Sequence, residues 1–132
     1  MRTPWALVAV AAAISTPASA HEFVDWFAYG RTELSPAGYR MVREVAAYSH
    51  AQHPARIIVT GHMDTAEARE FSDELSRRRA QAVATELVLL GVDPAQIEMM
   101  GYGADRLARP TPVDTREPLN RRVLVGFRFQ TS

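Results

Sequence analysis

Two charged side chains of this sequence are spaced so that they could bind a charged ligand. Asp64 stands just after Gly61, where the apolar run RIIVT ends, and Arg79 follows in LSRRRAQAV. A guanidinium can hold a carboxylate through two parallel hydrogen bonds, and a carboxylate can accept an ammonium group. The pair therefore suits a ligand that carries both an amine and a carboxylate. An internal Asp64–Arg79 ion pair that fastens a loop to a helix fits the same spacing equally well.

Helical periodicity turns Arg79 toward the protein interior. At about 100° per residue, Arg79 falls within the apolar arc of its predicted helix, whereas Arg77 and Arg78 fall outside it. A buried guanidinium keeps its charge and needs an acidic partner. Asp64 is the nearest candidate, because it lies in the segment between a strand and this helix. The arc itself comprises Leu75, Val83, Leu87 and Leu90.

The elements around this pair predict an α/β fold, an α+β sandwich in the order β-α-β-α-β-β with two helices packed on a mixed four-stranded sheet. The first helix is expected to begin after Ser35, and the second to run from an N-cap at Ser72 to Gly91. The segment 61–71 is expected to be a loop. Aromatic and β-branched residues indicate strands at residues 22–30, 56–60, 97–102 and 121–129.

The first twenty residues are expected to be a secretory signal peptide. Arg2 precedes the apolar run WALVAVAAAI and the small residues STPASA, an order typical of cleavage after Ala20. Residues 21–132 then form one domain. The sequence has no cysteine, so we expect no disulfide and no lipid anchor. With 15 basic and 15 acidic residues, the chain is a poor candidate for binding nucleic acid.

Several motifs resemble those of the OmpA-like domain, the peptidoglycan-binding module found in OmpA, Pal and MotB. They are, in chain order, GHMD, LSRRRAQAV, LLGV, GYGAD and NRRV. In that family an aspartate and an arginine hold the amine and the carboxylate of diaminopimelate in the peptidoglycan stem peptide, and the matching positions are Asp64 and Arg79. The resemblance also implies that Ser72, Thr65 and Tyr29 contact this ligand.

The resemblance implies an exported, non-catalytic module of the periplasm, associated with the cell wall and the outer membrane. Its partners would be the peptidoglycan stem peptide and other envelope proteins, without nucleic acid, cofactor or metal. Around the pair the sequence departs from the family, since Met63 replaces a threonine and Glu67 a glycine. We therefore predict weakened binding. The alternative is an envelope protein-interaction module of the same fold whose peptidoglycan site has decayed.

Other chemistry has weaker support in the sequence. His62 and Asp64, with His50 and His53 upstream, match no strong pattern of metal ligands, although a metal-dependent hydrolase centred on His62 and Asp64 is a third interpretation. No nucleophile-elbow motif is present. Arg121 and Arg122 are expected to face solvent or to bridge to loop acids.

Overall fold

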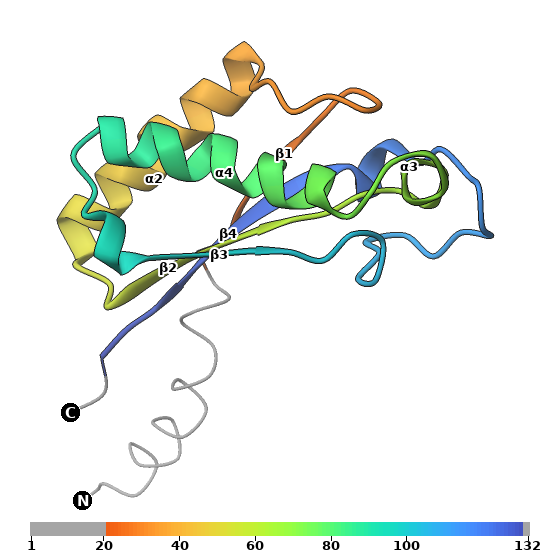
Figure 1. Ribbon diagram of the computed structural model, residues 1–132. Helices are drawn as coiled ribbons and strands as arrows, with labels where there is room; N and C mark the ends of the chain where they lie inside the picture. The colour runs from red at the N-terminus through yellow and green to blue at the C-terminus, as the bar shows by residue number, and fades with distance from the viewer. Residues whose placement is uncertain (1–20, 131–132) are drawn as a thin grey trace, which may run out of the picture.

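A four-stranded mixed sheet carries two long helices on one face (Figure 1). The computed structural model describes residues 21–130, so the expected signal peptide lies outside the described residues. The strand order is β1-β4-β2-β3, with β2 and β3 parallel and β4 antiparallel to both β1 and β2. This arrangement confirms the predicted fold class. The strands are β1 (Phe23–Trp26), β2 (Arg56–Gly61), β3 (Ile97–Gly101) and β4 (Arg122–Arg128).

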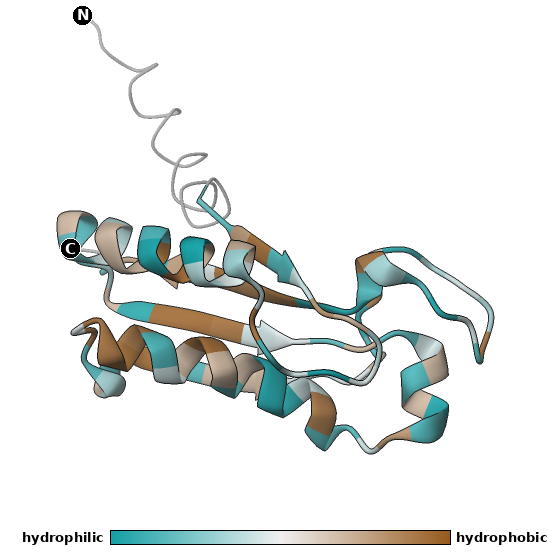
Figure 2. Ribbon diagram, turned by 90° about the horizontal axis from the view of Figure 1, so that it is seen from above, coloured by the Kyte–Doolittle hydropathy of each residue, from teal (hydrophilic) through white to brown (hydrophobic). Residues whose placement is uncertain are grey.

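The helices start and end where local chemistry allows. Helix α2 (Pro36–Gln52) begins after Ser35, whose hydroxyl accepts a hydrogen bond from the backbone N–H of Gly38 at 3.2 Å. Helix α4 (Glu74–Leu89) ends before Gly91, which has a φ of 96°. In Figure 2 the hydrophobic length of β2 lies between these two helices. Two short 3₁₀ helices, η1 (Pro94–Gln96) and η2 (Pro118–Asn120), precede β3 and β4.

Two glycines let α4 lie directly on the carboxyl ends of β2 and β3. A Cβ atom on Gly61 would overlap the carbonyl oxygen of Ser76, and one on Gly101 would lie 2.6 Å from the backbone nitrogen of Arg77. Strand and helix backbones therefore touch at the start of α4. This close approach fixes the depth at which Arg79 enters the interior.

The structure corrects three predictions about the segments of α3 and α4. The expected loop 61–71 contains a short helix, α3 (Thr65–Glu70), which begins after Asp64. The N-cap of α4 is Asp73 and not Ser72. Leu90 is 40% exposed, because α4 has already ended at Leu89. Within residues 21–130, no helix is both long enough and apolar enough to cross a bilayer.

Candidate functional site

Arg79 lies where α4 faces the sheet, and its side chain is completely buried. Its Nε donates to the carbonyl oxygen of Arg31 at 2.9 Å. Its Nη1 donates to the carbonyl oxygen of His62 at 2.9 Å, and its Nη2 to that of Ala28 at 3.3 Å. The predicted inward orientation of Arg79 is confirmed. Three backbone carbonyls from two separate loops thus hold the guanidinium in place.

The acidic partner of Arg79 is Glu67. Arg79 Nη1 lies 2.8 Å from Glu67 Oε1 and Nη2 lies 2.5 Å from Oε2, a two-pronged contact between side chains with no exposed surface. Oε2 also accepts from the backbone N–H of Gly30 at 2.7 Å, and Oε1 from that of Asp64 at 3.2 Å. We call these four donor atoms, Arg79 Nη1, Arg79 Nη2, Gly30 N and Asp64 N, the carboxylate cage.

The turn after β1 builds one side of the carboxylate cage. The predicted strand 22–30 stops at Trp26, and the chain then turns with a hydrogen bond from Arg31 N to Ala28 O of 3.0 Å. Gly30 has a φ of 69°, a left-handed conformation that favours glycine. In this conformation its N–H points at Glu67. The Phe71 ring packs over Gly30, where a Cβ atom would lie 3.0 Å from Phe71 Cζ.

Asp64 is also fully buried, but it binds a different arginine. Its Oδ1 accepts from Glu67 N at 2.7 Å and so caps α3, while its Oδ2 accepts from Glu117 N at 3.0 Å. Oδ2 also lies 2.9 Å from Nη1 of Arg121, whose side chain is 12% exposed. The structure thus contains two neighbouring ion pairs, Glu67–Arg79 and Asp64–Arg121. The internal Asp64–Arg79 ion pair, one of the two interpretations of the sequence, is not formed.

A capping box explains this exchange of partners. Asp64 caps the backbone of Glu67, and the Glu67 side chain returns to the backbone of Asp64. As the N-cap, Asp64 uses one carboxylate oxygen at the start of α3, and its other oxygen contacts Arg121. Arg121 bridges to an acid as expected, although this acid is the buried Asp64, whereas the expectation that Arg122 faces solvent or bridges to a loop acid is wrong. Arg122 is buried and donates to the carbonyl oxygen of Arg106 at 3.0 Å.

The other three predicted ligand residues lie around this centre without sharing one pocket. The Thr65 hydroxyl binds the loop that precedes β4, accepting from Thr115 N at 2.9 Å. The Tyr29 hydroxyl donates to Glu70 Oε1 at 2.6 Å, a hydrogen bond that raises the pKa of Tyr29. Ser72 is exposed between α3 and α4. Tyr29 and Phe71 lie side by side, with ring centroids 5.8 Å apart, beside Gly30.

The ring of His62 and the carboxylate of Asp64 contact different groups. The Nε2 atom of His62 lies 3.0 Å from the hydroxyl of Thr60, and its buried Nδ1 has no hydrogen-bond partner among residues 21–130. Burial, with smaller effects of Arg122 and Arg106, lowers the pKa of His62 to about 4. Among residues 21–130, no three His, Asp or Glu side chains are placed to hold a metal ion.

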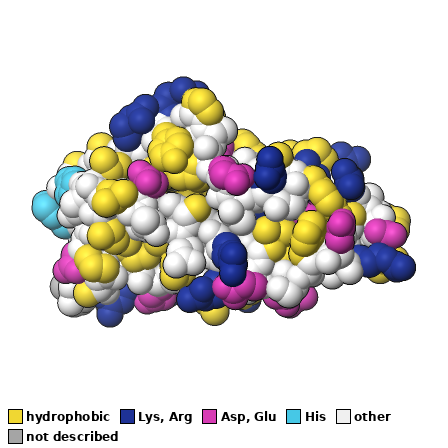
Figure 3. Space-filling view, turned by 45° about the horizontal axis from the view of Figure 1, so that its top comes forward, with side chains coloured by type: hydrophobic (Ala, Val, Ile, Leu, Met, Phe, Trp, Pro, Cys, Tyr) yellow, Lys and Arg dark blue, Asp and Glu magenta, His cyan; other side chains and the backbone are white. Residues whose placement is uncertain are grey.

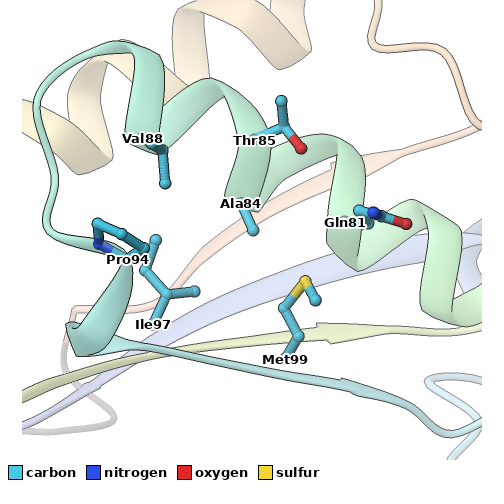
Figure 4. Close-up of a pocket in the computed structure, with 7 residues that line it drawn as sticks. All are labelled: Gln81, Ala84, Thr85, Val88, Pro94, Ile97 and Met99. Carbon is cyan, nitrogen blue, oxygen red and sulfur yellow. The ribbon is translucent and has the colours of Figure 1, made fainter.

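A groove of about 320 Å³ lies between α4 and β3 and offers little for binding a charged ligand. Figure 4 shows its lining, which includes the apolar side chains of Val88, Ile97 and Met99 and no ionisable group. Figure 3 shows basic and acidic side chains interspersed over the helix-bearing face. Such a mixed surface does not attract a polyanion. The Glu67–Arg79 centre, which holds the arginine that the sequence indicated, is the candidate site.

A family model described as the OmpA family matches residues 26–121. The chain belongs to the OmpA family. It is 36% identical over 98 residues to the peptidoglycan-associated lipoprotein of Pseudomonas aeruginosa. The aligned region covers 74% of this chain and 58% of that protein. It is 35% identical over 113 residues to an outer membrane protein of Gluconacetobacter diazotrophicus, covering 81% of this chain and 30% of the relative. The chain thus spans less than two thirds of each relative.

Solved structures support the same fold for this OmpA-family chain. The peptidoglycan-associated lipoprotein of Burkholderia pseudomallei matches with a TM-score of 0.71 and 23% identity, covering 80% of this chain and 90% of that one. The OmpA-like domain of FopA1 from Francisella tularensis also gives a TM-score of 0.71, with 24% identity. This match covers 80% of this chain and 70% of that one. At these identities the similarity establishes the architecture of the domain.

Sequence reasoning missed the central role of Glu67. It treated this residue as a departure from the family pattern, although Asp64-Thr65-Ala66-Glu67 has the spacing of a capping box. That local signal predicts that a helix begins at Asp64 and that the side chain of Glu67 accepts a hydrogen bond from the backbone of Asp64. The pairing of Asp64 with Arg121 has no comparable signal, because the two residues are 57 positions apart.

Proposed function

We propose that this chain is a non-catalytic module of the bacterial envelope that binds peptidoglycan non-covalently. Membership of the OmpA family supports this proposal, as does similarity to proteins named peptidoglycan-associated lipoproteins. The module is exported to the periplasm and is associated with the cell wall and the outer membrane. Peptidoglycan is its principal partner, and other envelope proteins are further partners.

The finer part of the proposal is recognition of diaminopimelate in the stem peptide. The observation that carries it is the buried Arg79 guanidinium, which is already arranged around a carboxylate in a two-pronged contact. Arg79 stands beside the carboxyl end of β2, the edge where ligands of α/β sheets gather. A carboxylate of diaminopimelate would bind Arg79, and its ammonium group would approach Asp64. Thr65, Ser72 and Tyr29 would line the approach to this pair.

A second function is favoured by one specific observation. Every N–H of the Arg79 guanidinium has an acceptor within the chain, and the side chain has no exposed surface. A closed site of this kind fits an envelope protein-interaction module that has lost peptidoglycan binding. The two functions differ in whether the folded chain binds the wall at all.

Co-sedimentation with purified sacculi separates them. The parent protein is mixed with sacculi whose stem peptides contain diaminopimelate and with sacculi that contain lysine at that position. Wall binding through diaminopimelate predicts sedimentation with the first kind and competition by free diaminopimelate. Equal sedimentation with both kinds would overturn the diaminopimelate assignment, and no sedimentation with either would favour the interaction module.

Two arginines on α4 provide a matched pair of variants for this assay. Arg79→Met is expected to abolish sedimentation, whereas Arg78→Met is expected to sediment like the parent, because Arg78 is exposed. Removing one partner of a buried ion pair costs roughly 3–5 kcal/mol. Circular dichroism must therefore show that Arg79→Met is folded at the assay temperature before its sedimentation is compared.

A further inference from the structure

The Glu67 carboxylate occupies the carboxylate cage as a bound ligand would. Each of its two oxygens accepts one hydrogen bond from Arg79 and one from a backbone N–H, with distances between 2.5 and 3.2 Å. Two donors on each oxygen satisfy a carboxylate group well. The contacts involve only the terminal carboxylate of Glu67, so any carboxylate of similar size meets the same requirements.

We infer that the carboxylate cage is a binding site that the chain fills with its own side chain, so that an external carboxylate enters only after Glu67 has left. The inference rests on the proposed function for the natural ligand, a stem-peptide carboxylate. While Glu67 fills the carboxylate cage, the site does not bind this ligand. The peptidoglycan site is thus regulated by an intramolecular competitor.

Most of the carboxylate cage stays in place without Glu67. The Arg79 guanidinium remains bound to the carbonyl oxygens of Ala28, Arg31 and His62, and it also lies 5.1 Å from the centre of the Phe27 ring. The groups that make these contacts lie in the loops after β1 and β2, not in α3. An external carboxylate would therefore meet donors that are already oriented, which reduces the cost of binding.

Helix α3 is the element that can carry Glu67 away. It has six residues, Thr65–Glu70, and a helix this short has little stability of its own. Segments of low local stability open without unfolding the whole domain. The Phe71 ring, which covers Gly30 at the end of α3, is 37% exposed. Opening of α3 would remove Glu67 and uncover the Gly30 side of the carboxylate cage together.

Rescue by small carboxylates tests this inference without peptidoglycan. Glu67→Ala leaves the four donors without their acceptor, so the variant is expected to be less stable than the parent. Thermal unfolding is followed in sodium acetate and sodium formate, with sodium chloride at equal ionic strength as reference. At ten times its dissociation constant, acetate bound only to the folded state should favour folding about elevenfold.

Matched controls make the rescue specific. Glu70→Ala, which removes an exposed acid from the same short helix, is expected to show no extra stabilisation by acetate over chloride. The parent and Glu67→Gln should likewise show none, because a side chain still fills the carboxylate cage. Equal responses of Glu67→Ala and Glu70→Ala would overturn the inference. If Glu67→Ala does not fold in chloride, its refolding yield in acetate becomes the measurement, and no recovery overturns the inference.

Sacculi binding then distinguishes this inference from the proposed function. If both are correct, Glu67→Ala sediments with diaminopimelate-containing sacculi more completely than the parent. Acetate rescue without sedimentation of parent or variant would refute peptidoglycan binding and leave the self-filled carboxylate cage standing. Sedimentation of the parent without acetate rescue would refute the self-filled cage and leave peptidoglycan binding standing.

Discussion

Asp64→Ala tests whether Asp64 holds the fold together at the start of α3. The substitution removes the acceptor of three hydrogen bonds, from Glu67 N, Glu117 N and Arg121 Nη1. Losing a helix N-cap costs about 1 kcal/mol. Losing one partner of a buried ion pair costs roughly 3–5 kcal/mol, and the lower end applies because Arg121 is partly exposed. We expect the free energy of unfolding to fall by about 4 kcal/mol.

Urea denaturation followed by circular dichroism measures this loss. A loss of this size should lower the melting temperature by roughly 15 °C for a domain of this length. Glu74→Ala is the control, because the two ion pairs that Glu74 forms within residues 21–130 are exposed, and it should change stability by about 0.5 kcal/mol or less. A loss below about 1 kcal/mol for Asp64→Ala would refute the buried ion pair.

A double-mutant cycle with Arg121→Ala isolates the ion pair itself. Residues in direct contact usually show coupling of about 0.5–3 kcal/mol. Asp64 and Arg121 should couple within this range, so the double variant should lose less stability than the two single losses added together. Strict additivity would mean that the 2.9 Å contact contributes nothing to folding.

Two further predictions concern residues next to the site. Gly61→Ala should prevent stable folding, because its Cβ would overlap the carbonyl oxygen of Ser76, whereas Gly126→Ala, with no atom within 4 Å of the added carbon, should melt within a few degrees of the parent. The pKa of His62 is lowered to about 4 in the folded state, so between that value and 6.5 the unfolded chain binds the proton more readily. The free energy of unfolding should therefore fall as the pH falls through this range. In urea titrations, the parent should lose about 2 kcal/mol more of this free energy than His62→Gln between pH 7 and pH 4.5.

Repeating patterns in the sequence predicted the directions of the main side chains. The helical period placed Arg79 inside and Arg77 and Arg78 outside, as the structure shows. Aromatic and β-branched residues predicted a strand at residues 121–129, and the structure has β4 there, with Val123 and Val125 fully buried. These predictions succeed because a helix or a strand fixes the direction of each side chain from its position in the element alone.

The partner of Arg79 could not be predicted in the same way. Asp64 and Glu67 are both acids of the segment between β2 and α4, and spacing alone favoured Asp64. At the start of the short helix α3 the two acids form a capping box, and Glu67 pairs with Arg79 while Asp64 pairs with Arg121. The capping-box spacing predicts α3, but only the folded loops show which arginine each acid reaches.

By itself, then, the sequence determined the fold class, the order of the strands and the two long helices, and the burial of one arginine, because these follow from local periodicity. The tertiary structure alone decided that the carboxylate cage is already occupied. Glu67 can fill the carboxylate cage because the fold brings together three distant parts of the chain. These are the turn after β1, the start of α3 and Arg79 of α4. A buried guanidinium binds whichever carboxylate the fold brings within about 3 Å, and here the fold brings Glu67.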